Sequence, residues 1–262
     1  MARDQLLQSR HGEAPARQAL SKVPEVTVLF WVVKVLTTGM GETTSDFLVK
    51  TFNPFLVVPV AGLVLAAALA VQLTAKRYSA AIYWFAVVMV SVFGTMAADV
   101  LHVQLGVPYV VSTSFFAVVL VAIFLLWYRS EKTLSIHSIT TRRRELFYWA
   151  TVLTTFALGT ATGDMTASTL KLGYFSSGVL FAVLIAIPTI AHWKLGLNAI
   201  FAFWFAYIVT RPLGASFADW MGVSHARGGL NWGTGWVSLV LAVLIAGFVG
   251  YLGVTRKDVA TS

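Results

Sequence analysis

The sequence contains no cysteine and few charged residues. Without cysteine the chain has no disulfide framework, no thiolate metal site and no catalytic thiol. Charged residues make up 11% of the 262 positions, whereas a soluble domain has about 25%. Hydrophobic residues make up 58%. These scarcities exclude cysteine redox chemistry and indicate that lipid is the solvent for most of the chain.

Long apolar stretches recur along the chain. Four of them run from Phe55 to Leu73, from Val110 to Trp127, from Val179 to His192 and from Val237 to Leu252. Each is close to the roughly 20 residues that a helix needs to cross a bilayer. The sequence therefore predicts a multi-pass membrane protein whose main partner is the lipid bilayer.

The net charge of +8 is explained by where the basic residues lie. Counting alternate connections between the apolar stretches, one side has only Lys50, Lys171 and Arg227. The other side has Arg3, Arg10, Arg17, Lys22, Lys76, Arg77, Arg129, Lys132, Arg142, Arg143, Arg144, Lys194, Arg256 and Lys257. By the positive-inside rule this basic side, with both termini, is cytoplasmic. Topology therefore accounts for the charge, and we expect no nucleic-acid partner.

The first 22 residues are polar and lack the apolar stretch of a cleavable signal peptide. We interpret residues 1–22 as a disordered cytoplasmic tail and residues 23–262 as one transmembrane domain.

Four segments of the chain share one pattern without gaps. They read FWVVKVLTTGMGETTSD, YWFAVVMVSVFGTMAAD, YWATVLTTFALGTATGD and FWFAYIVTRPLGASFAD. The common frame is an aromatic residue, Trp, nine residues, Gly, three residues, a small residue and Asp. Its fixed positions are Trp31, Trp84, Trp149 and Trp204, then Gly41, Gly94, Gly159 and Gly214, then Asp46, Asp99, Asp164 and Asp219. A period of this kind indicates internal repeats.

Each frame is followed by a second apolar span without the frame, so one repeat is a pair of helices. The sequence predicts an all-α membrane protein with eight spans, at residues 26–47, 54–74, 79–101, 110–128, 146–168, 174–192, 199–218 and 233–253. The repeats cover about residues 23–75, 76–135, 136–193 and 194–254. Because each repeat crosses the membrane twice, we expect pseudo-symmetry about the membrane normal.

The four Trp and Gly-x4-Asp frames, with Pro24-Glu25-Val26 and Gly41-Glu42-Thr43 in the first, resemble a known family. It comprises bacterial inner-membrane proteins made of four tandem repeats of unknown function, each with two transmembrane regions and a characteristic Trp. The resemblance covers residues 22–253 and implies a bacterial inner-membrane location. It implies no substrate.

Polar residues recur on one face of the framed helices, at the third, seventh, eleventh and fifteenth residues after the tryptophan. In the first repeat they are Lys34, Thr38, Glu42 and Asp46; in the fourth, Tyr207, Arg211, Ala215 and Asp219. Asp99 and Asp164 complete the set of candidate ion-binding residues. Burying an ionisable side chain at the centre of a membrane costs roughly 2.5 to 3.5 kcal/mol or more, so such residues are candidates for a functional role.

Two interpretations of these residues stay open. In the first, Glu42, Asp46 and Asp219 bind a cation or metal, Glu42 and Asp46 chelate it together, and Lys34 and Arg211 neutralise the empty site. In the second, the aspartates only end helices at the outer interface, and the charged residues form structural ion pairs. Asp99 and His102, three residues apart, are a weak candidate metal pair.

The remaining frame positions favour packing. We expect the four frame glycines to let the framed helices approach closely around a common axis, with the unframed helices outside. We expect the four tryptophans to form a membrane-interface belt or to pack inside. Pro212 should kink or break its helix, and Pro188 has the same potential.

No nucleotide-binding loop and no Ser/His/Asp arrangement is present, so we expect neither an enzyme nor a cofactor. The favoured function is an ion-gradient-driven transporter, more specifically an exporter of a small cation such as Mn²⁺ or Mg²⁺, with protons as counter-ion. The alternatives are a carrier of organic cations with aromatic walls, and a membrane scaffold or sensor that transports nothing. Homo-oligomers are compatible with each.

Overall fold

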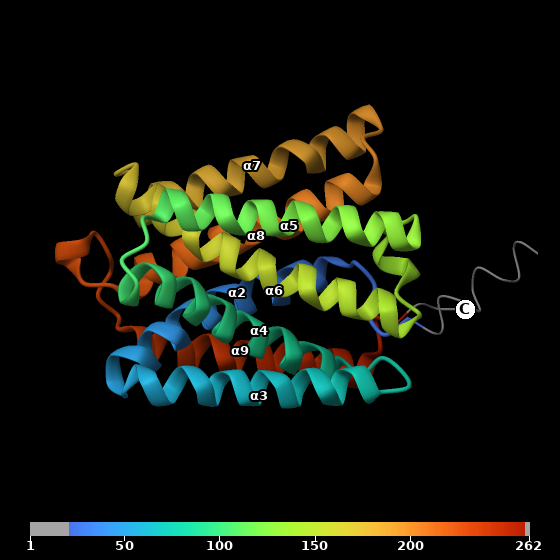
Figure 1. The fold of residues 1–262 in the computed structure, drawn as a ribbon, viewed down its shortest axis with the longest axis horizontal. Coiled ribbons are helices and arrows are strands. Elements are labelled where there is room, and N and C mark those ends of the chain that lie inside the picture. Colours follow the sequence, from blue (N-terminus) through green and yellow to red (C-terminus); the bar gives the residue numbers. More distant parts are fainter. Residues whose placement is uncertain (1–20, 260–262) are drawn as a thin grey trace, which may run out of the picture.

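The protein is a bundle of long helices that lie side by side along one axis (Figure 1). The computed structural model describes residues 21–259, and within that range it is all-helical with eight helices of at least 20 residues. They are α2 (Val28–Thr51), α3 (Pro54–Thr74), α4 (Ala80–Asp99), α5 (Tyr109–Glu131), α6 (Arg142–Asp164), α7 (Tyr174–Leu195), α8 (Ala199–Gly222) and α9 (Thr234–Thr255). Short helical turns accompany them: η1 (Val100–Gln104), η2 (Ile136–Ser138), η3 (Met165–Thr169) and η4 (His225–Arg227).

Each helix coincides to within a few residues with one predicted apolar span, which confirms the eight helices. Local sequence sets several of their starts. Thr27 caps α2 by accepting a hydrogen bond from the Phe30 N–H at 3.2 Å. Asn53 caps α3 in the same way, and Pro54 stands at the first helical position, where its missing N–H costs nothing.

Six helices of the described range are long and apolar enough to cross a membrane: α3, α4, α5, α7, α8 and α9. The other two carry more charge. Helix α2 contains Lys34, Glu42, Asp46 and Lys50, and α6 begins with three arginines and Glu145. Length and composition therefore indicate a membrane protein.

The four helices that carry the frame, α2, α4, α6 and α8, form a closed inner ring. Helix α2 packs on α4, α4 on α6, α6 on α8, and α8 again on α2. The unframed helices lie outside this ring, each chiefly against the framed helix that follows it in sequence: α3 against α4, α5 against α6, and α7 against α8. Helix α9 closes the circle by packing against α2.

The structure shows no helix break at the two prolines, and it holds residue 22 of the expected tail in place. Helix α8 runs unbroken through Pro212, and α7 runs unbroken through Pro188. The Pro212 ring packs closely against α6 at Gly159. A Cβ added to Gly159 would lie only 3.1 Å from Pro212 Cδ. Of the tail assigned to residues 1–22, residues 1–20 lie outside the described range. Lys22 is firmly held, with its ammonium 2.8 Å from Glu145 Oε2.

Candidate functional site

The frame glycines bring the ring helices into contact at one register. Each glycine receives the side chain that stands seven residues after the tryptophan in the next repeat. A Cβ added to Gly159 would lie 2.1 Å from Arg211 Cγ, and one added to Gly214 would lie 2.6 Å from Thr38 Cγ2. The other two contacts are Gly41 with Ser91 and Gly94 with Phe156. Because nothing larger than hydrogen fits, these glycines set the close spacing of the ring.

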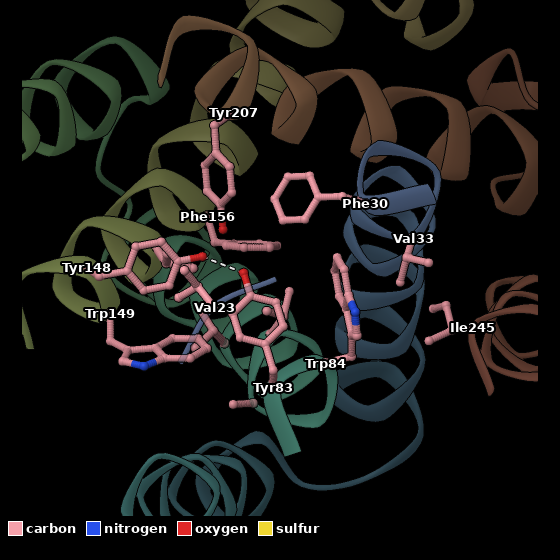
Figure 2. Close-up of a cluster of buried hydrophobic side chains, with 14 of the residues drawn as sticks. Val23, Phe30, Val33, Tyr83, Trp84, Tyr148, Trp149, Phe156, Tyr207 and Ile245 are labelled. Carbon is pink, nitrogen blue, oxygen red and sulfur yellow. Dashed lines mark hydrogen bonds between the residues drawn. The ribbon is translucent and has the colours of Figure 1, made fainter. Parts of the chain in front are cut away.

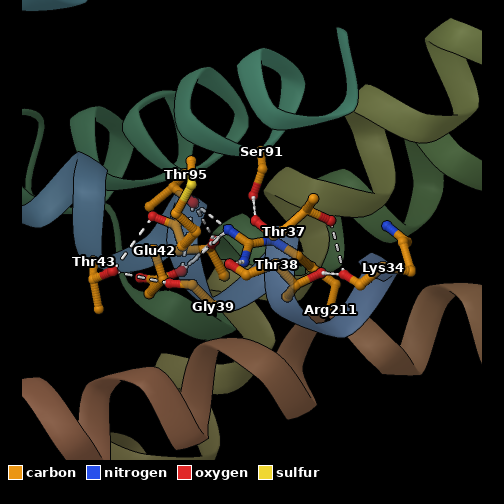
Figure 3. A network of polar contacts seen from close by, with 11 residues as sticks. Lys34, Thr37, Thr38, Gly39, Glu42, Thr43, Ser91, Thr95 and Arg211 are labelled. Carbon is orange, nitrogen blue, oxygen red and sulfur yellow. Dashed lines mark hydrogen bonds and ion pairs between the residues drawn. The ribbon is translucent and has the colours of Figure 1, made fainter. Parts of the chain in front are cut away.

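At the centre of the ring, one guanidinium group contacts all three other framed helices (Figure 3). Arg211 extends from α8, with 0% of its surface exposed. Its Nη1 donates to the Thr38 carbonyl oxygen at 2.8 Å, and its Nη2 donates to Glu42 Oε2 at 3.1 Å. Nη2 also donates to Thr160 Oγ1 at 2.9 Å and to Thr95 Oγ1. We call these four acceptors the central layer.

Glu42 balances the charge of Arg211 inside the ring. The residue is only 3% exposed, and its Oε2 also accepts from the Thr160 hydroxyl at 3.2 Å and from the Thr95 hydroxyl at 3.4 Å. A buried carboxylate is stabilised when several hydrogen-bond donors point at it, as they do here. Removing one partner of such a pair costs about 3–5 kcal/mol, because the other charge stays buried and uncompensated. The central layer is therefore a strongly coupled unit.

Lys34 lies two turns before Glu42 on α2 and has a different environment. It is 1% exposed, and its Nζ lies 3.9 Å from the centre of the Phe156 ring and 4.0 Å from the centre of the Tyr207 ring. Within residues 21–259 this Nζ has no hydrogen-bond acceptor. Arg211 Cζ lies 4.8 Å from the centre of the same Phe156 ring. The side chains of Lys34 and Arg211 thus contact the same aromatic ring.

A cluster of aromatic side chains fills the ring between Lys34 and the start of the framed helices (Figure 2). The hydroxyls of Tyr83 and Tyr148 form a hydrogen bond across it. Further members are Phe30, Trp84, Trp149, Phe203, Trp204 and Tyr207. Trp84, Trp149 and Trp204 are buried and Trp31 is half-buried, so the frame tryptophans pack inside the bundle. Aromatic packing therefore closes this end of the ring.

Residues 21–27, which we call the N-terminal strap, cross the same end. Lys22 donates to Glu145 Oε2 on α6 and, at 3.0 Å, to the Leu73 carbonyl oxygen on α3. The Gln72 side-chain amide donates hydrogen bonds to the Lys22 carbonyl oxygen at 3.3 Å and to Glu145 Oε1 at 3.2 Å. Val23 is buried in the aromatic cluster. The strap is thus tied to two helices, α3 and α6.

The chain after α9 strengthens this closure. The Glu25 N–H donates to the Asp258 carbonyl oxygen at 2.9 Å, and the Tyr78 hydroxyl donates to the Asp258 carboxylate. Burial, together with that carboxylate, raises the pKa of Tyr78 well above its usual range, so the phenol stays a donor. The strap and the segment after α9 therefore hold each other.

The opposite end of the ring contains a cavity of about 300 Å³. All four frame aspartates line it, together with Glu42 of the central layer. Those aspartates are Asp46, Asp99, Asp164 and Asp219. Tyr109, Tyr174, Lys50 and Arg227 are also among its walls. The structure thus brings five carboxylates from all four repeats to one cavity, which we call the acidic cavity.

The carboxylates of the acidic cavity have unequal partners. Asp46 forms an ion pair with Lys50 on its own helix. Asp219 is only 7% exposed, and no hydrogen bond or ion pair to its carboxylate is found within residues 21–259. Arg227 donates to the Tyr174 hydroxyl at 2.6 Å. Partial burial opposes the charge of Arg227, but Tyr174 and the Asp219 and Asp46 carboxylates outweigh it and raise its pKa.

The metal-binding arrangement expected from sequence is not assembled. Glu42 pairs with Arg211 and Asp46 pairs with Lys50, so the two carboxylates have different partners in this structure. In the part of the chain that the structure describes, no three His, Asp or Glu side chains are close enough to hold a metal ion. That includes the set Glu42, Asp46 and Asp219. Asp99 and His102 also form no such group, and His102 instead bonds to the Val107 carbonyl oxygen and stacks on Tyr109.

Sequence reasoning missed several residues of this axis. Nothing in the sequence pattern singles out Phe156, whose ring contacts both Lys34 and Arg211. Two π-helical turns, η1 and η3, follow Asp99 and Asp164 directly. Such turns are rare and often lie at functional sites. Arg227 offered one usable signal, because it is one of only three basic residues on its side of the chain.

Comparison with known proteins agrees with the repeat architecture. No curated protein and no solved structure matches this chain significantly. Four successive segments, residues 29–78, 82–133, 147–196 and 202–258, each match the model of the family described as Repeat of Unknown Function (DUF347). The matched segments cover most of the chain and correspond to the four predicted repeats. The chain therefore belongs to the DUF347 repeat family.

Proposed function

We propose that this chain crosses the bacterial inner membrane eight times, with both termini in the cytoplasm. Six apolar helices support membrane insertion, and α2 and α6 belong to the same ring as α4 and α8. The charges of α2 at Lys34 and Glu42 are buried in the ring rather than facing lipid. The recurring glycine contacts support an approximate fourfold axis along the membrane normal. The strap end carries the basic connections and is therefore cytoplasmic.

We further propose that the protein is a secondary transporter that exports a small cation along the axis of this ring. The observation that carries the proposal is the acidic cavity, where five carboxylates face Lys50 and Arg227. Four of these carboxylates come from the same position of the repeat. Such a surplus of negative charge inside a low-dielectric wall attracts cations. Protons compete with the cation for the same carboxylates, which couples transport to a pH gradient.

The two ends of the ring suit alternating access. The acidic cavity lies at the outer end in the proposed orientation, whereas the aromatic cluster and the N-terminal strap close the cytoplasmic end. The Glu42–Arg211 pair separates them. This arrangement corresponds to a state loaded or unloaded from outside. Export requires a second state in which the strap end opens and the cavity closes.

An organic cation is the second candidate cargo, and the tyrosines in the cavity wall suit it. A volume of about 300 Å³ is at the lower end for small-molecule sites, which span roughly 300–1,000 Å³. The walls include the Tyr109 and Tyr174 side chains, which suit an organic ammonium group. Residues 21–259 offer no three-ligand metal group, so a metal would have to pass partly hydrated. A scaffold that transports nothing is the third reading.

Uptake into proteoliposomes under a pH gradient tests the proposal, with a panel of divalent metals and organic cations. Asp219→Asn should strongly reduce uptake, because Asp219 lines the cavity and its carboxylate is unpaired there. Glu131→Gln is the matched control, because Glu131 lies at the end of α5 and pairs with Arg143 and Arg144 away from the cavity. Absence of uptake for every cation by well-folded wild-type protein would favour the scaffold.

A further inference from the structure

The central layer has the composition of a ligand site. Four oxygen atoms surround the guanidinium group of Arg211: the Thr38 carbonyl, one Glu42 carboxylate oxygen and the hydroxyls of Thr95 and Thr160. They also contact one another, since Thr160 Oγ1 lies 3.3 Å from Thr95 Oγ1 and 3.2 Å from Glu42 Oε2. The cup of oxygens is therefore compact, and its occupant is the head group of Arg211.

The repeats explain why this cup exists. Glu42, Thr95 and Thr160 each stand eleven residues after the tryptophan of their repeat, so equivalent positions supply three sides of the layer. The fourth repeat has Ala215 there, which is buried and has no polar side chain. Arg211, one turn earlier on α8, instead places its head group among the oxygens of the other three repeats. The repeats thus build a cation site, and the fourth repeat fills it from within.

The chemistry of the layer selects the class of cation. It holds a single carboxylate among neutral oxygens, so its formal charge is −1, which one monovalent cation neutralises. Every hydrogen bond of the Arg211 head group goes to an oxygen that accepts from N–H, the arrangement that a planar guanidinium satisfies best. A divalent metal would be left with one charged ligand, and the described residues offer no three-ligand group here. A small guanidinium compound therefore fits better than a metal ion.

We propose that the central layer is a binding site for monovalent cations of the guanidinium class, and that Arg211 stands in for the ligand in the empty protein. The proposal rests on the proposed function only for the role of the ligand as cargo. Glu42 belongs both to the layer and to the wall of the acidic cavity. A guanidinium compound that enters the cavity therefore meets Glu42, the residue that also binds Arg211.

Chemical rescue in detergent tests the site independently of transport. Arg211→Ala empties the layer and lowers the Tm. Ethylguanidinium, which matches the lost stem and head group, should restore much of the lost Tm in a saturable manner, and guanidinium should do so at higher concentration. Urea is the neutral control of the same shape, and sodium and Mn²⁺ at equal ionic strength are the ionic controls. In Arg211→Ala/Glu42→Gln the affinity for ethylguanidinium should fall about tenfold or more, because a charged hydrogen bond is lost.

Two results would overturn the proposal: equal stabilisation by urea or sodium, or no stabilisation by any guanidinium compound. Stronger rescue by Mn²⁺ than by ethylguanidinium would also overturn it, because the layer would then be a metal site. Arg211→Val serves if Arg211→Ala does not fold, since it keeps the atoms that pack on Gly159. Metal uptake by wild-type liposomes together with failed rescue would refute this site while the proposed transport stands.

Discussion

The Glu42–Arg211 pair permits a quantitative test of how the ring is held together. Glu42→Gln keeps the shape of the side chain and an acceptor oxygen but removes the charge, so Arg211 becomes a buried cation with 0% exposure and no counter-ion in contact. Arg211→Met removes the other charge and leaves Glu42 with only the hydroxyls of Thr95 and Thr160. Each single substitution should therefore destabilise the fold, and each should do so through the charge that it leaves behind.

The expected losses follow from burial. Removing one partner of a buried pair costs about 3–5 kcal/mol. We expect about 3 kcal/mol for Glu42→Gln, at the low end because the amide still accepts from Nη2, and about 4 kcal/mol for Arg211→Met. The double variant leaves no uncompensated charge, so its loss should be only about 2 kcal/mol. The coupling energy is then about 5 kcal/mol, above the usual range of about 0.5–3 kcal/mol for residues in contact.

The assay is reversible unfolding of the four purified proteins in one detergent, with the free energy of unfolding measured for each. Thr43→Ser, one residue along α2, is a control for mild change in the same helix, because its hydroxyl bonds only to backbone carbonyls of α2. Additive losses, with the double variant about 7 kcal/mol less stable than wild type, would show that the two charges do not interact. The description of the central layer as one unit would then be wrong.

Three further predictions concern the rest of the axis. Gly159→Ala should destabilise by about 1–3 kcal/mol or more because its Cβ meets Arg211, whereas Gly250→Ala, with open space around it, should stabilise α9 by up to about 1 kcal/mol; thermal unfolding compares them. Lys22→Met removes the bond between the strap and Glu145, so a single cysteine introduced at position 83 should be labelled faster by a maleimide added from the cytoplasmic side. Unchanged labelling would contradict a strap that closes this end. Asp219→Asn should weaken cation uptake without a comparable loss of Tm, since its carboxylate has no partner to leave behind, and a matched loss of both would indicate a structural role.

The helices and the repeat could be predicted from the sequence because they depend on local properties. Apolar length determines where a membrane helix runs, and capping residues such as Asn53 and Thr27 determine where it begins. The frame repeats without gaps, so equivalent residues of the four repeats had to occupy equivalent depths. The same argument placed the four aspartates at one end, where the structure has them around one cavity.

The partners of the charged residues could not be predicted in the same way. The glycine frame indicates which face of each framed helix meets the ring, but the apolar periodicity does not reveal which side chain of a neighbouring helix each charged residue contacts. Asp46 and Glu42, four residues apart, looked like one chelating pair, yet they point to different partners, Lys50 and Arg211. Lys34 looked like a counter-ion for carboxylates, and it lies between Phe156 and Tyr207 instead.

The sequence by itself determined the helices, their order, the repeat and the register of its glycines and aspartates, because each of these follows from spacing along one helix. Only the tertiary structure decided that Arg211 reaches Glu42 in the first repeat, 169 residues away, and that the strap closes the ring at Glu145. The physical reason is ring closure. Which side chains meet at the axis depends on the rotation and order of four helices packed at glycine contacts, and no single helix contains that information.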